Sequence, residues 1–286
     1  MLWAKRHHFD LIYANTVGSL AEGIGMKRHL DIPLWLHIHE TERTCHRRHI
    51  TKEMFQQCEH FISVSSLSTN ALVNFGVPNE KISIVRPFSE HLTNTDVEPV
   101  SLEGVDDDTF VIGLSGVGGW RKGSDVFPMV VKKFIAKHPN VNCKFVWLGG
   151  LHPDETPYDL KHLKIEKYVL MPGLVSNPME YYKRFDVFLL TSREDPFPLV
   201  CMENAALANP IIMFQGTSGI ADLVIDRQTG LQVPYLDVDA MSDAIYKLYS
   251  DRNLRTNLGN NLRMRLLQNF SKEKSIGQLL QLLGHK

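Results

Sequence analysis

The stretch VFLLTSREDPFPLVCME, residues 187–203, decides the fold class of this chain. Its first four residues, Val187–Leu190, form a short apolar run of the kind that fills a buried strand. A polar loop follows, and from Phe197 an apolar segment begins a helix that carries Glu203. A strand that passes through a loop into a helix is the repeating unit of a parallel α/β sheet. Because ligands of such sheets lie beyond the carboxyl ends of the strands, we expect binding groups in this loop.

Short apolar runs alternate with amphipathic stretches along the whole chain. The strands predicted in the first third are Phe9–Tyr13, Pro33–Ile38, His60–Val64 and Lys81–Val85. Those predicted after residue 108 are Phe110–Leu114, Lys144–Leu148, Tyr168–Met171, Val187–Leu190, Ile211–Phe214 and Leu231–Val233. The predicted helices include Leu2–His7, Val17–Lys27, Glu40–Gln57, Ser66–Phe75, Ser124–Lys137, Ala240–Tyr249 and Lys272–Leu283. A polar, acidic stretch from Ser89 to Asp108 separates the two runs of strands and predicts a domain boundary near residue 98.

The composition excludes several classes of protein. With 31 Lys+Arg against 32 Asp+Glu, the net charge of -1 argues against a strongly cationic nucleic-acid binder. No run approaches the roughly 18 apolar residues of a membrane-spanning helix. The four cysteines form no C-x-x-C pair, which argues against a disulfide framework. We expect a cytoplasmic α/β protein.

A glycine-rich loop follows the strand Phe110–Leu114. Four glycines from Gly116 to Gly123 let backbone N–H groups approach an anion, and Arg121 and Lys122 add positive charge before a helix. The loop is neither a Walker A loop nor a dinucleotide fingerprint, because Arg121 stands where each requires glycine. It therefore predicts phosphate binding by another arrangement, the alternative being a flexible loop whose basic pair faces water.

The loop after Val187–Leu190 offers carboxylates and backbone donors. Asp195 and Glu203 suit sugar or ribose hydroxyls, because a carboxylate accepts directed hydrogen bonds. Residues Phe197–Val200 lie at the start of the helix, where free N–H groups point toward an anion. The alternative is that Asp195 only caps the helix and Glu203 is an exposed helical residue.

These motifs together resemble the donor half of family 4 retaining glycosyltransferases. The matching segments are RKG (121–123), SREDPFPLV (192–200), ENAA (203–206), NP (209–210), TSGIAD (217–222), TGLQVP (229–234) and PLWLHIHE (33–40). The resemblance implies the GT-B fold, in which two Rossmann-like domains face each other across a cleft. Residues 1–98 would be a partial acceptor domain, 99–270 the nucleotide-sugar domain, and 271–286 a helix that crosses back to the first domain.

The resemblance also implies roles for single residues. His39, Asp195 and Lys122 would be catalytic, with His39 and Asp195 near the transferred sugar. Arg121 and Lys122 would neutralise the donor diphosphate, and Glu203 would bind the ribose. The full set of implied donor-binding residues is Gly118, Gly119, Arg121, Lys122, Glu194, Asp195, Phe197, Leu199, Val200 and Glu203. Neither a metal nor a cofactor is implied, because the nucleotide sugar is itself the substrate.

The chain departs from the family pattern at three positions. The spacing from Glu203 places the first acid of the usual Glu pair at Asp195 rather than Glu194. Gly116 stands where the family often carries an arginine, and Asn209 stands where it usually has glycine. Asn209 tolerates the left-handed conformation but is bulkier. The first two departures bear on donor affinity.

Other polar clusters have simpler explanations. A zinc site is a possible reading of His37, His39, Cys45, His46 and His49, but their spacing matches no common ligand pattern. His37 could instead be a hydrogen-bonded core residue. The D-x-D sequence at Asp237 and Asp239 precedes a helix and is better explained by capping. A basic face of Arg43, Arg47, Arg48 and Lys52 is either solvated or contacts an acceptor phosphate or an anionic membrane surface.

The leading functional hypothesis is a retaining glycosyltransferase that uses a nucleotide-sugar donor and a glycan or lipid-linked acceptor. It would act in polysaccharide or cell-envelope synthesis, in the cytoplasm or at the inner face of the membrane, and would bind no nucleic acid. The alternatives are a nucleotide-sugar-binding module with little transferase activity and, third, a nucleotide-sugar epimerase. The opening strands and glycine-rich loop expected of the acceptor domain are absent, so either the start codon lies upstream of Met1 or this is a reduced enzyme. The four remaining strands would expose a sheet edge and apolar surface, and we expect poor solubility or self-association.

Overall fold

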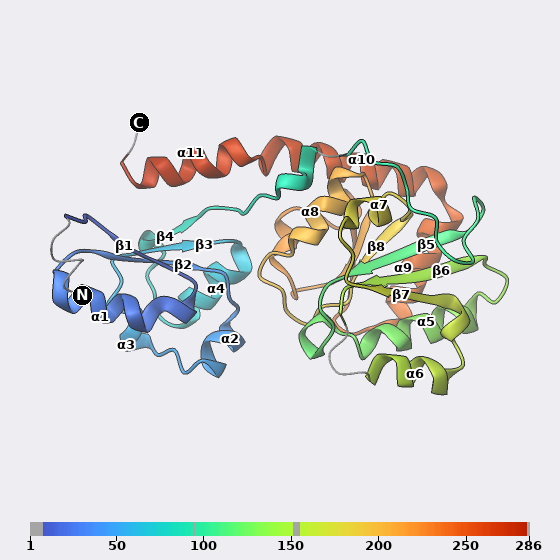
Figure 1. Cartoon of the computed structure of the whole chain (residues 1–286), viewed down its shortest axis with the longest axis horizontal. Coiled ribbons are helices and arrows are strands. Elements are labelled where there is room, and N and C mark those ends of the chain that lie inside the picture. Colours follow the sequence, from blue (N-terminus) through green and yellow to red (C-terminus); the bar gives the residue numbers. More distant parts are fainter. Residues whose placement is uncertain (1–7, 94, 151–154, 285–286) are drawn as a thin grey trace. The chain divides into compact units, whose positions relative to one another are not determined.

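The structure, a computed structural model, describes residues 8–93, 95–150 and 155–284 (Figure 1). The helical segment predicted at Leu2–His7 lies outside the described residues. The chain divides into two compact units: unit 1, Met1–Pro87 with Ser275–Lys286, and unit 2, Phe88–Lys274. The acidic stretch in which we placed the boundary near residue 98 belongs to unit 2.

Unit 1 is built on a parallel four-stranded sheet of order β1-β2-β3-β4. Its strands are β1 (Ile12–Asn15), β2 (Leu34–Ile38), β3 (His60–Ser63) and β4 (Ile82–Ile84). The connecting helices are η2 (Val17–Ser19), α1 (Leu20–Leu30), α2 (Glu42–Arg47), α3 (Lys52–Phe55), α4 (Ser66–Asn74) and η3 (Asn79–Lys81). Leu34, Leu36 and Ile38 of β2 are buried, as expected where alternate side chains face a core. All four predicted strands of this unit are present.

The single helix predicted over Glu40–Gln57 is wrong. The structure breaks it into α2 and α3, because His49 adopts a left-handed conformation (φ 55°) that a helix cannot continue through. Thr51 then starts α3 by accepting a hydrogen bond from the Met54 N–H at 3.4 Å. The predicted basic face is therefore divided, with Arg43 and Arg47 on α2, Arg48 at its end and Lys52 on α3.

Unit 2 is built on a parallel six-stranded sheet of order β10-β9-β8-β5-β6-β7. Its strands are β5 (Phe110–Ser115), β6 (Cys143–Leu148), β7 (Val169–Gly173), β8 (Val187–Leu190), β9 (Ile211–Phe214) and β10 (Gly230–Val233). Its α-helices are α5 (Val126–Lys137), α6 (Glu155–Leu163), α7 (Pro178–Tyr182), α8 (Leu199–Ala206), α9 (Val238–Ser250) and α10 (Arg252–Asn269), and α11 (Lys272–Leu282) follows. Its short helices are η4 (Glu90–Thr93), η5 (Trp120–Lys122), η6 (Glu166–Tyr168) and η7 (Gly219–Asp222). All six predicted strands are present.

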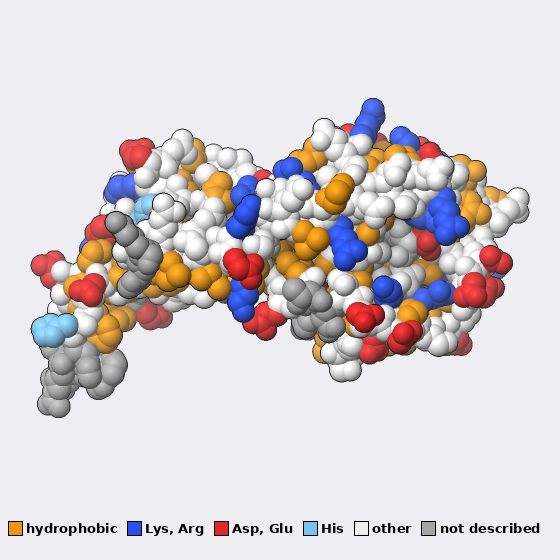
Figure 2. All heavy atoms as spheres, turned by 90° about the horizontal axis from the view of Figure 1, so that it is seen from above, with side chains coloured by type: hydrophobic (Ala, Val, Ile, Leu, Met, Phe, Trp, Pro, Cys, Tyr) orange, Lys and Arg blue, Asp and Glu red, His pale blue; other side chains and the backbone are white. Residues whose placement is uncertain are grey.

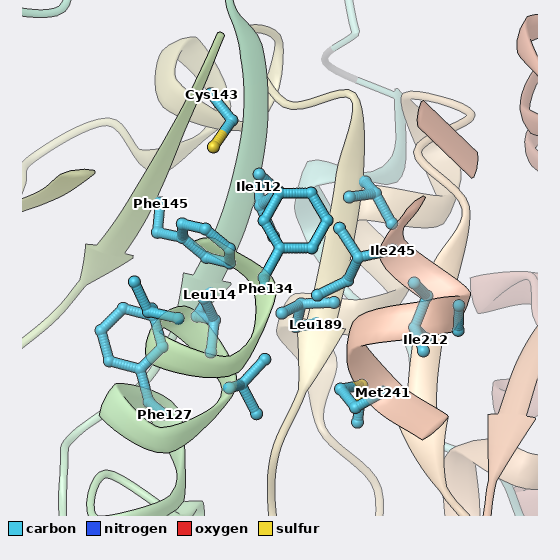
Figure 3. Packing of buried hydrophobic residues seen from close by; sticks show 14 of the residues in the cluster. Ile112, Leu114, Phe127, Phe134, Cys143, Phe145, Leu189, Ile212, Met241 and Ile245 are labelled. Atoms are coloured by element: carbon cyan, nitrogen blue, oxygen red, sulfur yellow. The ribbon is translucent and has the colours of Figure 1, made fainter. Parts of the chain in front are cut away.

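Helices cover both faces of the unit 2 sheet. On one face α5 and α9 pack Phe127, Phe134 and Ile245 against Phe145 and Leu189 of the strands, forming the larger core (Figure 3). On the other face lie α7, α8 and α10 (Figure 1). With both faces covered, the central strands β8 and β9 are apolar and buried along their whole length, which explains why short continuous apolar runs predicted them. This arrangement leaves the carboxyl ends of the strands and the loops that follow them for binding.

The outer surface carries both signs of charge. On the side shown in Figure 2, Lys and Arg side chains (blue) are interspersed with Asp and Glu side chains (red) over both units. Among residues 8–93, 95–150 and 155–284, no helix combines the length and the apolar character needed to span a membrane.

Candidate functional site

The glycine-rich loop lies at the carboxyl end of β5. Its backbone is fixed to neighbouring strand ends, since the Gly116 N–H donates to the Leu148 carbonyl at 2.9 Å and the Gly118 N–H to the Gly150 carbonyl at 2.7 Å. Gly118 is buried and Gly119 is half-buried. The loop then forms the single turn η5, which carries Arg121 and Lys122.

Gly123 closes this turn and requires glycine for two reasons. Its φ of 70° is left-handed, and a Cβ there would lie 2.2 Å from the Thr191 carbonyl oxygen. The close approach brings η5 against the loop that follows β8. Lys122 and Asp195, which are 73 residues apart in the sequence, meet as a result.

Three charged groups form one cluster in unit 2. Lys122 Nζ lies 2.5 Å from Asp195 Oδ2, and Arg121 Nη1 lies 3.2 Å from Asp195 Oδ1. The side chains of Lys122 and Asp195 are 13% and 7% exposed, whereas that of Arg121 is 45% exposed. Arg121 Nη1 also donates to the Glu194 carbonyl at 3.3 Å. The alternative of a basic pair that merely faces water is therefore wrong for Lys122.

Asp195 is held in this cluster by its own backbone. Its N–H donates to the Thr217 carbonyl at 2.8 Å, and its carbonyl accepts from the Gly219 N–H at 3.0 Å. The loop after β9, which contains the segment TSGIAD, thus supports the loop after β8. These two hydrogen bonds fix the backbone at Asp195 and thereby the position from which its carboxylate reaches Lys122 and Arg121.

Helix α8 carries the second predicted acid. Glu203 is 8% exposed, and its Oε1 accepts a hydrogen bond from Ser89 Oγ at 3.0 Å. The N-cap of α8 is Pro198, which provides no side-chain cap. The alternative of a capping Asp195 and an exposed Glu203 is wrong on both counts.

The other residues predicted on α8 are divided between surface and core. Leu199 is 42% exposed at the start of the helix, and Val200 beside it is half-buried. Phe197 is 8% exposed and stacks on Phe270, with ring centroids 5.9 Å apart. Phe197 therefore anchors the helix start to the end of α10.

His39 belongs to unit 1, at the end of β2. Its Nε2 lies 2.8 Å from Asn15 Oδ1, and its backbone N–H donates to Glu40 Oε2 at 2.9 Å. Burial lowers the pKa of His39, and the charge of Glu40 partly opposes this. The imidazole of His39 is therefore neutral at pH 7, a form that can exchange a proton or a hydrogen bond with a bound hydroxyl.

His37 lies beside His39 and was not assigned a role. Its Nδ1 is 2.6 Å from the Tyr13 hydroxyl, and the centroids of the His37 and His39 rings lie 4.2 Å apart. Burial, and the neighbouring His39 after it, lower the pKa of His37 to about 3. His37 is thus a neutral, half-buried and hydrogen-bonded residue. This agrees better with a core residue, the alternative that its place in a strand suggested, than with a metal ligand.

The zinc reading finds no support in unit 1. Throughout the described ranges, no group of three His, Cys, Asp or Glu side chains is arranged to hold a metal ion. Cys45 is buried on α2, and burial raises the pKa of its thiol to about 12, which disfavours a thiolate ligand. The D-x-D motif is a cap, since Asp237 Oδ1 accepts from the Ala240 N–H at 2.9 Å.

The third departure from the family pattern has a different basis from the one we expected. Ala208, with φ 61°, adopts the left-handed conformation, and Asn209 does not. Asn209 is buried instead, and its Nδ2 donates to the Tyr182 carbonyl at 2.7 Å and to Asn204 Oδ1 at 3.0 Å. Its larger side chain is therefore accommodated as a link between α7 and α8.

Comparison with known proteins identifies the family. The sequence profile described as Glycosyl transferases group 1 matches residues 102–265, more than half of the chain. The chain belongs to this family. The profile described as Glycosyltransferase Family 4 matches residues 1–88. The family inferred from the motifs is thus confirmed.

Curated relatives of this group 1 chain include two bacterial enzymes. The chain is 29% identical over 168 residues to the capsular polysaccharide biosynthesis glycosyltransferase CapM of Staphylococcus aureus, covering 58% of this chain and 43% of CapM. It is 27% identical over 172 residues to the alpha-galactosylglucosyldiacylglycerol synthase of Streptococcus pneumoniae, covering 56% of this chain and 44% of that enzyme. The aligned part is less than half the length of either relative.

Solved structures show the fold of this group 1 chain. HepE of Anabaena in complex with UDP aligns with a TM-score of 0.83 at 18% identity, covering 99% of this chain and 80% of HepE. The sucrose-phosphate synthase of Thermosynechococcus elongatus aligns with a TM-score of 0.84 at 20% identity, covering 99% of this chain and 75% of that enzyme. The chain has the GT-B fold class that the resemblance implied.

Proposed function

We propose that this protein transfers a sugar from a nucleotide-sugar donor to a glycan or lipid-linked acceptor, with retention of the anomeric configuration. The observation that carries the proposal is the cluster of Lys122, Arg121 and the buried Asp195 at the carboxyl end of the unit 2 sheet. Two adjacent cations suit the charge of a diphosphate, and they lie where α/β sheets bind their ligands.

The two cations would act on the leaving group. Negative charge builds on the diphosphate as the bond to the sugar breaks, and a fixed cation stabilises that charge without reorganisation. Lys122, mostly buried, would supply the stronger interaction, because the low local dielectric weakens screening. Since Arg121 and Lys122 supply this charge, we propose that neither a metal nor a further cofactor is needed.

The remaining residues would orient the donor. Glu203, buried on α8, would accept hydrogen bonds from the ribose hydroxyls. Backbone N–H groups at Leu199 and Val200, in the first turn of α8, would meet the β-phosphate. Asp195 would contact the transferred sugar, while Gly118, Gly119 and Glu194 would shape the loop around it. By the family resemblance, the neutral His39 of unit 1 would be a further catalytic residue.

The relatives suggest which substrates to test first. CapM acts in capsular polysaccharide synthesis and the pneumococcal relative makes a glycolipid, which supports a cell-envelope acceptor. Solved complexes of HepE contain UDP or UDP-glucose, which supports UDP-sugars as the first donors. A cytoplasmic location, with peripheral contact at the inner face of an anionic membrane, is the setting that such acceptors would require.

Turnover of labelled nucleotide sugars tests the proposal. UDP-, GDP- and ADP-sugars would be titrated calorimetrically, and the donor that binds would be offered with glycan and lipid-linked acceptors in EDTA. We expect transfer in EDTA, and a product whose anomeric configuration, measured by NMR, equals that of the donor. Donor binding with no transfer to any acceptor would favour the nucleotide-sugar-binding module instead, and an inverted product would exclude retention.

A further inference from the structure

Three consecutive carbonyl groups of η5 are bound by the loop that follows β8. Arg193 Nη1 donates to the Trp120 carbonyl at 2.8 Å, and the Arg193 backbone N–H donates to the Arg121 carbonyl at 2.8 Å. Thr191 Oγ1 donates to the Lys122 carbonyl at 2.9 Å. The turn that carries both cations is therefore attached, carbonyl by carbonyl, to one short segment of chain.

These hydrogen bonds have an electrostatic consequence. A carbonyl oxygen carries partial negative charge and would repel a bound anion. Because the carbonyls of Trp120, Arg121 and Lys122 are engaged by Thr191 and Arg193, they are not free to turn toward a phosphate. The groups that η5 offers to an anion are therefore the side-chain cations of Arg121 and Lys122.

The side chain of Arg193 makes one of these three hydrogen bonds and several further contacts around the turn. Its guanidinium binds Asp125 through two hydrogen bonds, Nη1 to Oδ1 at 2.7 Å and Nη2 to Oδ2 at 2.6 Å. It also lies over the Trp120 ring, 5.1 Å from the centroid. The side chain is 11% exposed, while that of Asp125, at the N-cap of α5, is 52% exposed. One guanidinium thus connects the end of β8, the turn η5 and the start of α5.

We propose that Arg193 is a positioning residue for the donor diphosphate. It holds η5 so that Arg121 and Lys122 stay within reach of the phosphates, and it does not itself touch the donor. A lysine at this position could keep the charge but not the planar fork that binds Asp125 twice and lies over Trp120. This inference rests on the proposed function, because it presumes that η5 binds a diphosphate.

Calorimetric titration of UDP and UMP separates positioning from general stability. The proteins are the wild type, Arg193→Ala, Arg193→Lys and the control Arg227→Ala, whose side chain is 81% exposed on the surface of the same unit. We expect Arg193→Ala to weaken UDP binding about tenfold or more and UMP binding less than about twofold, because a misplaced turn loses the second phosphate. Arg193→Lys should recover part of the loss, and Arg227→Ala should match the wild type.

Several results would overturn the inference. One is equal weakening of UDP and UMP by Arg193→Ala, which would indicate a general structural role. Another is wild-type UDP binding by Arg193→Ala. If Arg193→Ala does not fold, Asp125→Asn replaces it, because this substitution alters the exposed carboxylate that Arg193 binds. Asp125→Asn should weaken the binding of UDP more than the binding of UMP. A wild-type protein that binds none of UDP, GDP and ADP would overturn the proposed function itself, and this inference with it.

Discussion

Lys122 and Asp195 form an ion pair of 2.5 Å between two loops of unit 2, and both side chains are largely buried. Arg121 completes the cluster at 3.2 Å. Asp195 is thus the counter-ion of both cations that we propose to bind the diphosphate. We expect the donor diphosphate to compete with Asp195 for these cations, and the first substitution below follows from this competition.

Asp195→Asn should separate nucleotide binding from turnover. Removal of the competing carboxylate frees Lys122 and Arg121, so UDP should bind several-fold more tightly, while turnover should fall about 100-fold or more because the group beside the sugar is lost. The unpaired buried Lys122 should lower the free energy of unfolding by about 3 kcal/mol, and UDP should restore much of it. Calorimetry and thermal unfolding with and without UDP measure these effects, with Asp195→Glu as the conservative control. Weaker UDP binding by Asp195→Asn would contradict the competition.

Glu203→Ala should abolish recognition of the ribose. We expect the wild type to bind UDP more tightly than 2′,3′-dideoxy-UDP, and Glu203→Ala to bind both about equally, because the carboxylate accepts hydrogen bonds from the hydroxyls. The matched control is Ser89→Ala, which removes the hydrogen-bond donor to Glu203 and keeps the carboxylate. Competition binding against a labelled nucleotide measures the six affinities of the three proteins for the two nucleotides. Persistent discrimination in Glu203→Ala would place the ribose elsewhere.

Gly123→Ala should disrupt the loop contact that forms the site. The added Cβ would lie 2.2 Å from the Thr191 carbonyl oxygen at a φ of 70°, so unit 2 should lose about 2 kcal/mol or more. Donor binding should weaken as well, because η5 and the loop after β8 move apart. Gly150→Ala is the control, since no atom lies within 4 Å of its Cβ position. Urea unfolding gives the stabilities, and similar values for the two variants would contradict the argument.

The free energy of unfolding should decrease as the pH is lowered, and His37 should account for part of the decrease. Its pKa is about 3 in the folded chain, against an ordinary value of 6.5, so below pH 6.5 the unfolded chain binds a proton that the folded chain does not. The free energy of unfolding should therefore decrease from pH 6.5 toward pH 3, with a contribution approaching about 1.4 kcal/mol per pH unit. His37→Gln should flatten this dependence, and replacement of the exposed His29 by Gln should not. Parallel pH profiles for the wild type and His37→Gln would refute this role of His37.

The strands were predictable because both sheets are built from short buried runs. Val187–Leu190 and Ile211–Phe214 were predicted at their observed bounds, since each is a continuous apolar segment between polar loops. The break between α2 and α3 was missed because the apolar pattern continues across His49. Thr51 was the available signal, as a capping residue just before α3.

The site was predictable in its residues but not in its pairings. Local motifs identified Arg121, Lys122, Asp195 and Glu203, because glycines, cations and acids follow strands there. Nothing local shows that Asp195 neutralises Lys122, since that contact depends on a backbone approach across 73 residues. Arg193 was missed for the same reason, as its partners lie in the other loop.

Lys122→Ala gives the most direct test of the central claim, that this cluster binds the diphosphate of a nucleotide-sugar donor. Titration calorimetry with UDP, GDP and ADP would compare it with the wild type and with Lys133→Ala, an exposed lysine on α5 that pairs with Asp239. The account predicts that the wild type and Lys133→Ala bind at least one of these nucleotides equally, and that Lys122→Ala binds it at least about tenfold more weakly. Equal binding by all three proteins would contradict it.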